Sequence, residues 1–451
     1  MRVHFISIGG SVMHQLAIAL KKKGYEVSGS DDEIFEPSRT NLQLQGLLPS
    51  TMGWHSETIT ADIKAVILGM HAKADNPEIA KAKELSLPIY SFPEYIFEES
   101  KQKTRVIVGG SHGKTTTTAM IMHVLKYAKK NFDYLVGARI NGFKQSVNIT
   151  DAPVIVCEGD EYPASTIERR PKFHFLYPHI AIITGIAWDH INIFPTFENY
   201  LEQFKIFIDK IESGGLLIYN QTDKVLTDLV ALCNRKDIRY QPYKVPDFTI
   251  HNGRTSVTLA GVTETLNVFG NHNLLNLHAA YYACNKLGIS AETFLRGIST
   301  FKGADRRMEL MASNSNTYVY RDFAHAPSKV KATIEAAKQQ FADRQLIAVL
   351  ELHTFSSLNE AFMQQYSGAM ELADKAVVFY SNHALELKRM PPLPEAAVLK
   401  GFNKPGLQVI TNKEALQKWL HQQNFKNANL LFMSSGNYDG LDIATFAKEN
   451  V

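Results

Sequence analysis

A glycine-rich turn at residues 109–113 constrains the possible folds of this chain more than any other feature. The β-branched apolar residues 106–108 precede the turn, and Lys114-Thr115 and a helix-compatible segment follow it. Glycine allows backbone N–H groups to face an anion, and the N-terminus of the next helix adds a partial positive charge. This order of strand, turn and helix predicts a loop that binds the phosphates of a nucleotide.

Each residue type in this loop fits a separate task. The Lys114 side chain is expected to reach the β- and γ-phosphates, and the Thr115 hydroxyl is expected to ligate Mg²⁺. Val108 stands where the longer form of the loop has its first glycine, so the loop has the shorter pattern Gly-Ser-x-Gly-Lys-Thr. A turn that merely connects a strand to a helix is the alternative interpretation. The other expected nucleotide contacts in the loop are Gly110, Ser111, Gly113 and Thr116.

The composition is ordinary for a soluble globular protein and argues against several classes of function. The 451 residues predict two to four domains, since a domain usually has about 100–200 residues. A net charge of +3 is too small to indicate nucleic acid or an anionic membrane as a partner. The N-terminus has no signal-peptide pattern and no segment has about 18 consecutive apolar residues, so the cytoplasm is the expected location. The cysteines are far apart and fit neither a disulfide framework nor a zinc site.

Residues 1–98 predict a first unit in which strands and helices alternate. Strands are expected at 2–8, 25–30, 65–69 and 88–90, and helices at 12–23, 76–85 and 93–99. A polar and basic segment at 101–105 marks the expected boundary with the next domain. Alternation of this kind is typical of a Rossmann-like fold with a parallel sheet.

The first turn of this unit, Gly9-Gly10-Ser11, matches part of a dinucleotide-binding fingerprint. Asp31 follows the second strand, 21 residues after Gly10, where an acid binds a ribose hydroxyl in Rossmann sites. The third glycine of the fingerprint is missing, which weakens the case for NAD. A nucleotide-sized ligand near Gly10, Ser11 and Asp31 is therefore the favoured interpretation. An NAD-dependent oxidoreductase and a plain connecting turn are the alternatives.

Two strand ends in the middle of the chain predict metal ligands. The apolar strand at 154–157 leads to Glu158, and phosphate-loop enzymes use an acid in such a position to organise Mg²⁺. The strand at 180–184 is followed by His190, which is expected to be a second metal ligand. A solvated acidic turn and a surface histidine are the alternatives.

Two asparagines follow a segment of short alternating stretches. Residues 240–268 predict a small antiparallel patch. Asn273 and Asn276 come next, three residues apart on one helix face, so their amides could read the edge of a base. On spacing alone, they could equally cap the N-terminus of the helix.

The remainder of the chain predicts a third α/β unit. Strands are expected at 317–320, 346–350, 376–380, 408–411 and 429–433, with helices between them. The whole chain is therefore predicted to be an α/β protein of three domains. These are a Rossmann-like domain at 1–98, a central P-loop ATPase-type domain with a parallel sheet at 99–303, and a Rossmann-like C-terminal domain at 304–451.

Six motifs occur in the order in which the Mur ligase family has them, so the chain resembles that family over almost its whole length. The motifs are 110–117, 158–161, 188–190, 270–273 with Asn276, 306–309 and 322–327. Each motif alone is modest evidence, whereas all of them in order are specific. The family consists of ATP-dependent amino-acid and peptide ligases of bacterial cell-wall synthesis.

The resemblance implies a reaction and roles for the candidate residues. Family members transfer the γ-phosphate of ATP to the muramyl lactyl carboxylate, and an incoming amine attacks the resulting acyl phosphate. The implied catalytic residues are Lys114, Glu158, His190 and Arg307, with Thr115, Glu158 and His190 as Mg²⁺ ligands. The implied ATP contacts outside the loop are Asn273, Asn276, Arg307, Asp322 and His325. The implied sugar-nucleotide contacts in the first domain are Gly10, Ser11, Asp31 and His71.

Within the family, the chain is more similar to ligases that attach the tripeptide L-alanyl-γ-D-glutamyl-meso-diaminopimelate in peptidoglycan recycling than to those that attach L-alanine. The segments that carry this similarity are 28–31, 36–37, 169–175 and 322–325. The chain departs from common family residues at Gly185, Arg321, Ala326 and 352–354. L-Alanine is the alternative acceptor, and a monomer or a weak homodimer is expected.

Overall fold

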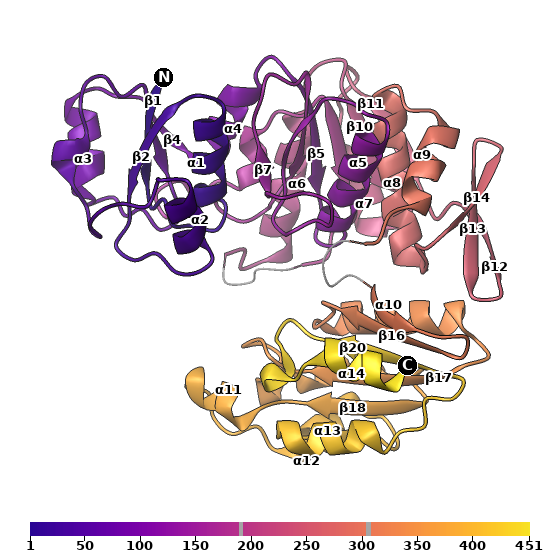
Figure 1. Cartoon of the computed structure of the whole chain (residues 1–451). Coiled ribbons are helices and arrows are strands. Elements are labelled where there is room, and N and C mark those ends of the chain that lie inside the picture. Colours follow the sequence, from indigo (N-terminus) through magenta and orange to yellow (C-terminus); the bar gives the residue numbers. More distant parts are fainter. Residues whose placement is uncertain (189–192, 304–307) are drawn as a thin grey trace. The chain divides into compact units, whose positions relative to one another are not determined.

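The computed structural model describes residues 1–188, 193–303 and 308–451 (Figure 1). Contacts between these residues divide them into two compact units. The first unit comprises Met1–Val245 and Leu275–Ile298, and the second comprises Pro246–Leu274 and Ser299–Val451. In the part of the chain that the structure describes, no helix is long and apolar enough to cross a membrane.

The first unit begins with a parallel four-stranded sheet in the order β2-β1-β3-β4. Its strands are β1 (Arg2–Ile6), β2 (Glu26–Ser30), β3 (Ala65–Leu68) and β4 (Ile89–Ser91), and its helices are α1 (Met13–Lys22), α2 (Ser38–Leu44), α3 (Pro77–Glu84) and α4 (Phe92–Ser100). Local signals set the helix ends. The Asn76 side chain caps α3 by accepting a hydrogen bond from the Glu78 amide at 2.9 Å, and Gly24 follows α1 with a left-handed φ of +96°. The predicted alternation of strands and helices is confirmed here.

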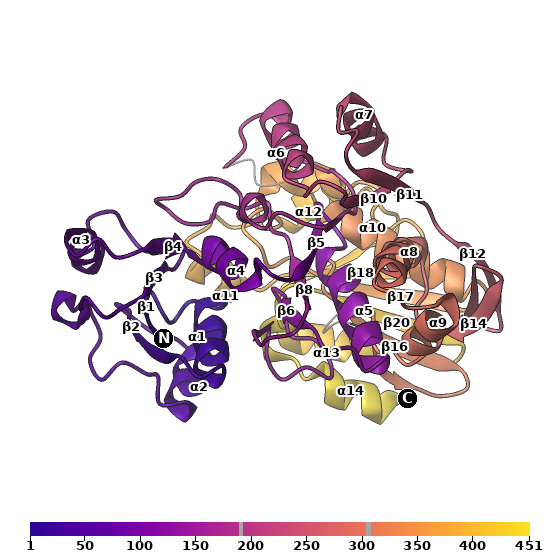
Figure 2. The ribbon, with the colours of Figure 1, turned by 90° about the horizontal axis from the view of Figure 1, so that it is seen from above.

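The largest sheet has seven strands in the order β11-β10-β9-β5-β8-β6-β7, all parallel except β7. The strands are β5 (Thr104–Gly109), β6 (Asp133–Leu135), β7 (Val147–Asn148), β8 (Val154–Glu158), β9 (Ile180–Ile183), β10 (Leu216–Asn220) and β11 (Arg239–Tyr243). The helices of this region are α5 (Lys114–Tyr127), α6 (Phe197–Asp209), α7 (Lys224–Leu232), α8 (Asn271–Lys286) and α9 (Ala291–Ser299). Helices cover both faces of the sheet, with α5 and α6 on opposite sides of β5 (Figure 2).

One prediction for this region is partly wrong. The antiparallel patch was expected over 240–268, but Arg239–Tyr243 form β11, which runs parallel to β10 and extends the large sheet. β11 is the edge strand of this sheet, and only Tyr243 among its five residues is buried.

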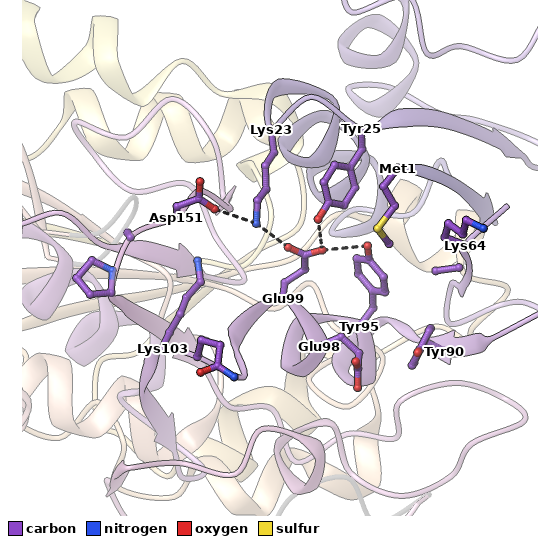
Figure 3. Close-up of a pocket in the computed structure, with 14 residues that line it drawn as sticks. Met1, Lys23, Tyr25, Lys64, Tyr90, Tyr95, Glu98, Glu99, Lys103 and Asp151 are labelled. Carbon is purple, nitrogen blue, oxygen red and sulfur yellow. Dashed lines mark hydrogen bonds and ion pairs between the residues drawn. The ribbon is translucent and has the colours of Figure 1, made fainter. Parts of the chain in front are cut away.

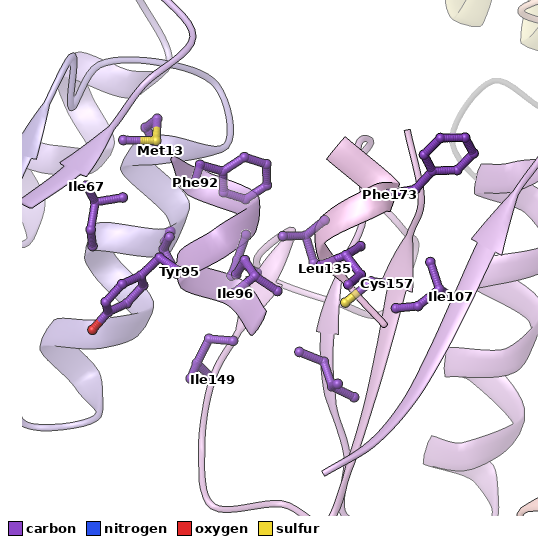
Figure 4. Packing of buried hydrophobic residues seen from close by; sticks show 14 of the residues in the cluster. Met13, Ile67, Phe92, Tyr95, Ile96, Ile107, Leu135, Ile149, Cys157 and Phe173 are labelled. Carbon is purple, nitrogen blue, oxygen red and sulfur yellow. The ribbon is translucent and has the colours of Figure 1, made fainter. Parts of the chain in front are cut away.

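The two sheets of the first unit share one apolar core. Phe92 and Ile96 on α4 belong to the same buried cluster as Ile107, Leu135 and Ile149 of the central region (Figure 4). These side chains are at most 8% exposed. Burial of apolar area stabilises by about 25 cal/mol per Å², so the contact between the sheets contributes to the stability of both.

A polar network lies beside this core, around a cavity of about 640 Å³ (Figure 3). The Glu99 carboxylate accepts hydrogen bonds from Lys23 Nζ at 2.9 Å and from the hydroxyls of Tyr25 and Tyr95 at 3.0 Å. Lys23 Nζ also lies 3.5 Å from Asp151 Oδ1. Because Tyr25 directly precedes β2, the cavity lies at the amino ends of the strands, at the edge opposite the predicted sugar-nucleotide site.

The second unit contains two sheets. The three-stranded antiparallel sheet consists of β12 (Asp247–His251), β13 (Arg254–Leu259) and β14 (Val262–Leu266). The six-stranded sheet has the order β15-β16-β20-β17-β18-β19 and is parallel except for β15. Its strands are β15 (Glu309–Ser313), β16 (Thr317–Asp322), β17 (Gln345–Glu351), β18 (Lys375–Phe379), β19 (Gln408–Ile410) and β20 (Ala428–Met433). Its helices are α10 (Pro327–Gln340), α11 (Asn382–Leu387), α12 (Glu395–Phe402), α13 (Lys413–His421) and α14 (Ile443–Asn450).

The parallel strands predicted for this unit are confirmed, and the architecture is α/β throughout. Strand β15 was not predicted. It pairs with β16, where Arg321 forms an ion pair with Glu309 at 2.7 Å. Arg321, which departs from the common family residue at this position, is therefore paired with an acid on the neighbouring strand.

Candidate active site

The glycine-rich turn lies between β5 and α5, at the carboxyl edge of the seven-stranded sheet. Gly110 and Gly113 have left-handed φ values of +125° and +82°. A Cβ atom at Gly110 would lie 2.1 Å from Thr184 Oγ1, and one at Gly113 would lie 2.3 Å from Asn276 Oδ1. Both positions therefore require glycine. Val108 is buried within β5, so the loop starts after it and the missing glycine leaves the loop intact.

Lys114 is the first residue of α5, and its ammonium is held inside the loop. Lys114 Nζ donates to the Gly110 carbonyl at 2.6 Å and forms an ion pair with Glu161 Oε2 at 2.7 Å. Burial by itself lowers the pKa of Lys114, but the adjacent Glu161 carboxylate together with Asp160 and Glu158 outweighs this effect and raises it. The side chain is therefore a fixed cation at the N-terminus of a helix, as binding of a polyphosphate requires.

Thr115 and Glu158 lie together, as the sequence predicted. The Thr115 hydroxyl donates to Glu158 Oε1 at 3.0 Å, and the Gly137 amide donates to Glu158 Oε2 at 3.0 Å. Burial raises the pKa of Glu158, and the Gly137 amide and Lys114 act in the opposite direction. A hydroxyl and a carboxylate beside a phosphate loop are the oxygen ligands that Mg²⁺ takes together with phosphate oxygens and water.

No group of three or more His, Cys, Asp or Glu side chains that could hold a metal ion occurs among residues 1–188, 193–303 and 308–451. The described donor set fits Mg²⁺ because this ion usually keeps several waters and uses one or two protein carboxylates. His190, predicted as a second metal ligand, lies outside the described residues.

Ser111 has protein partners in this structure. Its hydroxyl lies 2.8 Å from the Tyr200 hydroxyl and accepts a hydrogen bond from the Ala187 amide at 2.9 Å. Tyr200 in turn donates to Glu161 Oε1 at 3.3 Å. Sequence reasoning assigned no role to Glu161 or Tyr200. The available signal for Glu161 was its membership of the acidic motif at 158–161.

The two asparagines have different surroundings. Asn276 is buried inside α8, and its Oδ1 accepts a hydrogen bond from Thr117 Oγ1 at 3.3 Å. The capping interpretation is wrong for Asn276, because α8 begins at Asn271. Asn273 lies in the first turn of α8 and donates to the Phe269 carbonyl at 3.2 Å.

Thr116, another predicted nucleotide contact, is buried in the first turn of α5. Contact of Thr116 and the two asparagines with a nucleotide stays a prediction.

The predicted sugar-nucleotide residues lie at the carboxyl edge of the four-stranded sheet. Asp31 follows β2, and its Oδ2 accepts a hydrogen bond from the Gly9 amide at 2.7 Å. Gly10 and Ser11 continue the turn between β1 and α1. His71 is exposed in the loop that follows β3. These four residues therefore belong to loops at one edge of the sheet, where open parallel sheets bind ligands.

Replacing Asp31 with asparagine is expected to change how stability depends on pH. Burial raises the pKa of Asp31 from 3.8 to about 6, so between these values the folded chain holds a proton that the unfolded chain has lost. The stability from this proton is complete below about pH 4 and is lost as the pH rises through about 6.

Thermal unfolding of the two proteins at about pH 4.5 and about pH 7.5 measures this effect. The wild-type chain should lose on the order of 2 kcal/mol relative to the Asp31→Asn variant between these conditions. The same difference in unfolding free energy at both pH values would contradict the prediction.

The candidate ATP-binding residues of the six-stranded sheet form hydrogen bonds with nearby backbone groups. Asp322 at the end of β16 accepts hydrogen bonds from the amides of Met308 and Ala324, both at 2.7 Å. The His325 ring lies 2.8 Å, through Nδ1, from the Phe323 carbonyl. Arg307 lies outside the described residues. The predicted contacts of Asp322 and His325 with ATP stay predictions.

A mostly parallel sheet, a phosphate loop and an acid at the end of the neighbouring strand define a nucleotide-dependent α/β enzyme. Three family models match consecutive parts of the chain. They are the Mur ligase family catalytic domain at residues 2–104, the Mur ligase middle domain at 108–284 and the Mur ligase glutamate ligase domain at 306–436. The chain belongs to the Mur ligase family. It is an ATP-dependent ligase that joins an acid to an amine, in a family that serves peptidoglycan synthesis.

Known proteins resemble this chain over most of its length. The UDP-N-acetylmuramate–L-alanine ligase of Sulfurihydrogenibium sp. is 32% identical over 385 residues, which cover 84% of this chain and 82% of that protein. A murein peptide ligase from Psychrobacter arcticus has the same fold, with 24% identity, a TM-score of 0.62 and coverage of 100% of this chain and 99% of that one. The UDP-N-acetylmuramate-alanine ligase of Thermotoga maritima is 22% identical, with a TM-score of 0.68 and coverage of 100% and 98%.

Proposed function

We propose that this chain uses ATP and Mg²⁺ to join the carboxylate of UDP-N-acetylmuramate to the amine of L-alanyl-γ-D-glutamyl-meso-diaminopimelate, in peptidoglycan recycling. The observation that carries the proposal is the arrangement of Lys114, Thr115 and Glu158 at one end of the large sheet. A nucleotide-binding protein that uses ATP only as a switch, or an NAD-dependent oxidoreductase, gains no support from membership of a ligase family.

Amide formation at neutral pH explains why these groups are needed. A carboxylate is a poor electrophile, so it is first converted to an acyl phosphate with the γ-phosphate of ATP, and the amine then displaces phosphate. Because the first transfer brings two anions together, the site must concentrate positive charge. Lys114 and the N–H groups at the start of α5 would provide part of it. Thr115 and Glu158 would hold Mg²⁺, which would supply further positive charge at the phosphates.

The remaining residues keep the roles predicted for them. His190 would hold a second Mg²⁺, and Arg307, Asp322 and His325 would contact ATP. Asn273 and Asn276 would contact the adenine side, and Gly10, Ser11, Asp31 and His71 the sugar nucleotide. Location in the cytoplasm and a monomeric or weakly dimeric state are part of the same proposal.

The choice of acceptor rests on the segment that follows Glu161. Residues 169–175 resemble an insertion of the tripeptide ligases, and here they belong to a closed loop in which the Ala164 amide donates to the Arg170 carbonyl at 3.0 Å. The competing acceptor is L-alanine, which is the acceptor in the name of the relative that is 32% identical.

Separate reactions with the two acceptors test this choice. With ATP, Mg²⁺ and UDP-N-acetylmuramate, the value of kcat/KM for the tripeptide is expected to exceed that for L-alanine by about 10²-fold or more, because buried polar contacts discriminate strongly against ligands that leave them unpaired. A preference for L-alanine would assign the chain to the other branch of the family.

A further inference from the structure

Glu161 is a buried carboxylate at the phosphate loop to which the proposed reaction gives no role. It is 1% exposed, and its Oε2 accepts from Lys114 Nζ at 2.7 Å. Its Oε1 accepts from the hydroxyl of Tyr200, which is fully buried. A carboxylate in such a place is costly unless it is paired, so the ion pair with Lys114 is what makes its burial tolerable.

The contacts of Lys114 with the protein leave one of its N–H donors for a ligand. An ammonium group has three N–H donors. Among the described residues, Gly110 and Glu161 accept two of them, at 2.6 and 2.7 Å. The third donor can then serve a phosphate oxygen without loss of the first two contacts. Glu161 thus restricts the rotation of a long, flexible side chain, whose ordering otherwise costs about 2 kcal/mol of rotamer entropy.

The backbone fixes the position of Glu161 from both sides. It belongs to the loop from Asp160 to Phe173 (loop 160–173), which is closed by a hydrogen bond from the Phe173 amide to the Asp160 carbonyl at 3.1 Å. An ion pair between Lys172 and Asp160 at 2.6 Å strengthens this closure. The Glu161 carboxylate is therefore presented to Lys114 from a loop whose ends are tied together.

The tip of loop 160–173 is anchored on the loop that follows β3 of the four-stranded sheet. The Thr166 amide donates to the Met70 carbonyl at 3.1 Å, and the Thr166 hydroxyl donates to the Ala72 carbonyl at 2.6 Å. Met70 and Ala72 flank His71 in the loop after β3. The loop that carries Glu161 thus connects the phosphate loop with the predicted sugar-nucleotide side.

We propose that Glu161 is a positioning residue, which acts through Lys114 by holding its ammonium in the geometry that binds the nucleotide phosphates. This inference rests on the proposed function, since it requires that the loop bind a nucleotide. It predicts that the effect of Glu161 on nucleotide binding depends on the presence of Lys114.

A double-mutant cycle on the affinity of the full-length chain for ADP tests the inference without any sugar or acceptor. Glu161→Gln, which keeps the size of the side chain, is expected to weaken ADP binding about tenfold in the otherwise wild-type chain. In the Lys114→Met background, the same change should alter the affinity by less than about twofold. Thermal-shift titration measures ADP binding and reports the folding of each variant at the same time.

Glu168→Gln provides a matched control, because Glu168 lies on the same loop and pairs with Arg170 at the surface. It should bind ADP like the wild-type chain. An equal loss of affinity from Glu161→Gln in both backgrounds would assign Glu161 a structural role and overturn the proposal. Unchanged or tighter ADP binding by Glu161→Gln would overturn it as well. If the wild-type chain did not bind ADP, the proposed function itself would fail, and this inference with it.

Discussion

Replacement of Lys114 with alanine is expected to lower ATP-dependent ligation by at least about 10³-fold, while the affinity for UDP-N-acetylmuramate stays within about threefold of wild type. Removal of a single donor that stabilises a transition state costs about 10²–10³ in turnover. The Lys114→Ala change also leaves the buried Glu161 carboxylate without its counterion, which adds to the loss of ligation activity. The sugar nucleotide is expected to bind at the four-stranded sheet, in loops separate from the phosphate loop, so its affinity should persist.

Calorimetric titration with UDP-N-acetylmuramate and a coupled assay for ADP measure the two effects on the same preparation. Lys126→Ala is a suitable control, because Lys126 lies on the same helix but is exposed near its C-terminal end. The Lys126→Ala control should bind UDP-N-acetylmuramate and catalyse ligation like the wild-type chain. Loss of sugar-nucleotide binding by Lys114→Ala would show that the two sites are not separate, and retained ligation would remove Lys114 from the nucleotide site.

Replacement of Glu158 with glutamine is expected to lower turnover by about 10²–10³-fold and to raise the Mg²⁺ concentration that gives half-maximal activity. Glutamine retains the size of the side chain and can still accept the hydrogen bond from Thr115, which measures 3.0 Å in the native chain. It lacks the negative charge by which a carboxylate strengthens the binding of a divalent cation, so a selective effect on Mg²⁺ is expected.

Titration of activity with Mg²⁺ separates this effect from a general loss of structure. Glu202→Gln removes an exposed carboxylate from α6 in the same unit and should leave the titration unchanged. If Glu158→Gln had the same Mg²⁺ dependence as the wild-type chain, Glu158 would not be a metal ligand.

Short-range signals explain why much of the fold could be predicted. The sequences of β5, β8 and β9 are almost continuously apolar, which is typical of central parallel strands, and the structure buries them. The glycines after β5 mark a turn whose φ values other residues rarely adopt. The convergence of Thr115 and Glu158 was expected because phosphate-loop enzymes use an acid at a strand end to organise Mg²⁺. The structure adds the reason, since β5 and β8 are parallel neighbours that end at one edge of the sheet.

Contacts between distant segments explain what could not be predicted. The buried Asn276 contacts Thr117 in α5, the helix that follows the phosphate loop, although 159 residues separate them in the sequence. Glu161 was part of a recognised acidic motif, yet only the fold shows that it faces Lys114 rather than solvent. β11 had the alternation of an antiparallel strand, and its parallel pairing with β10 depends on the tertiary position of the sheet edge.

The most direct measurement is the product of a reaction that contains ATP, Mg²⁺, UDP-N-acetylmuramate and the tripeptide. The proposed function predicts that mass spectrometry detects the amide of the sugar nucleotide with the tripeptide and that ADP forms in an equimolar amount. It also predicts that omission of either the sugar nucleotide or the acceptor abolishes ADP formation above background. Steady ADP formation without the acceptor, or the absence of an amide product with both the tripeptide and L-alanine, would contradict it.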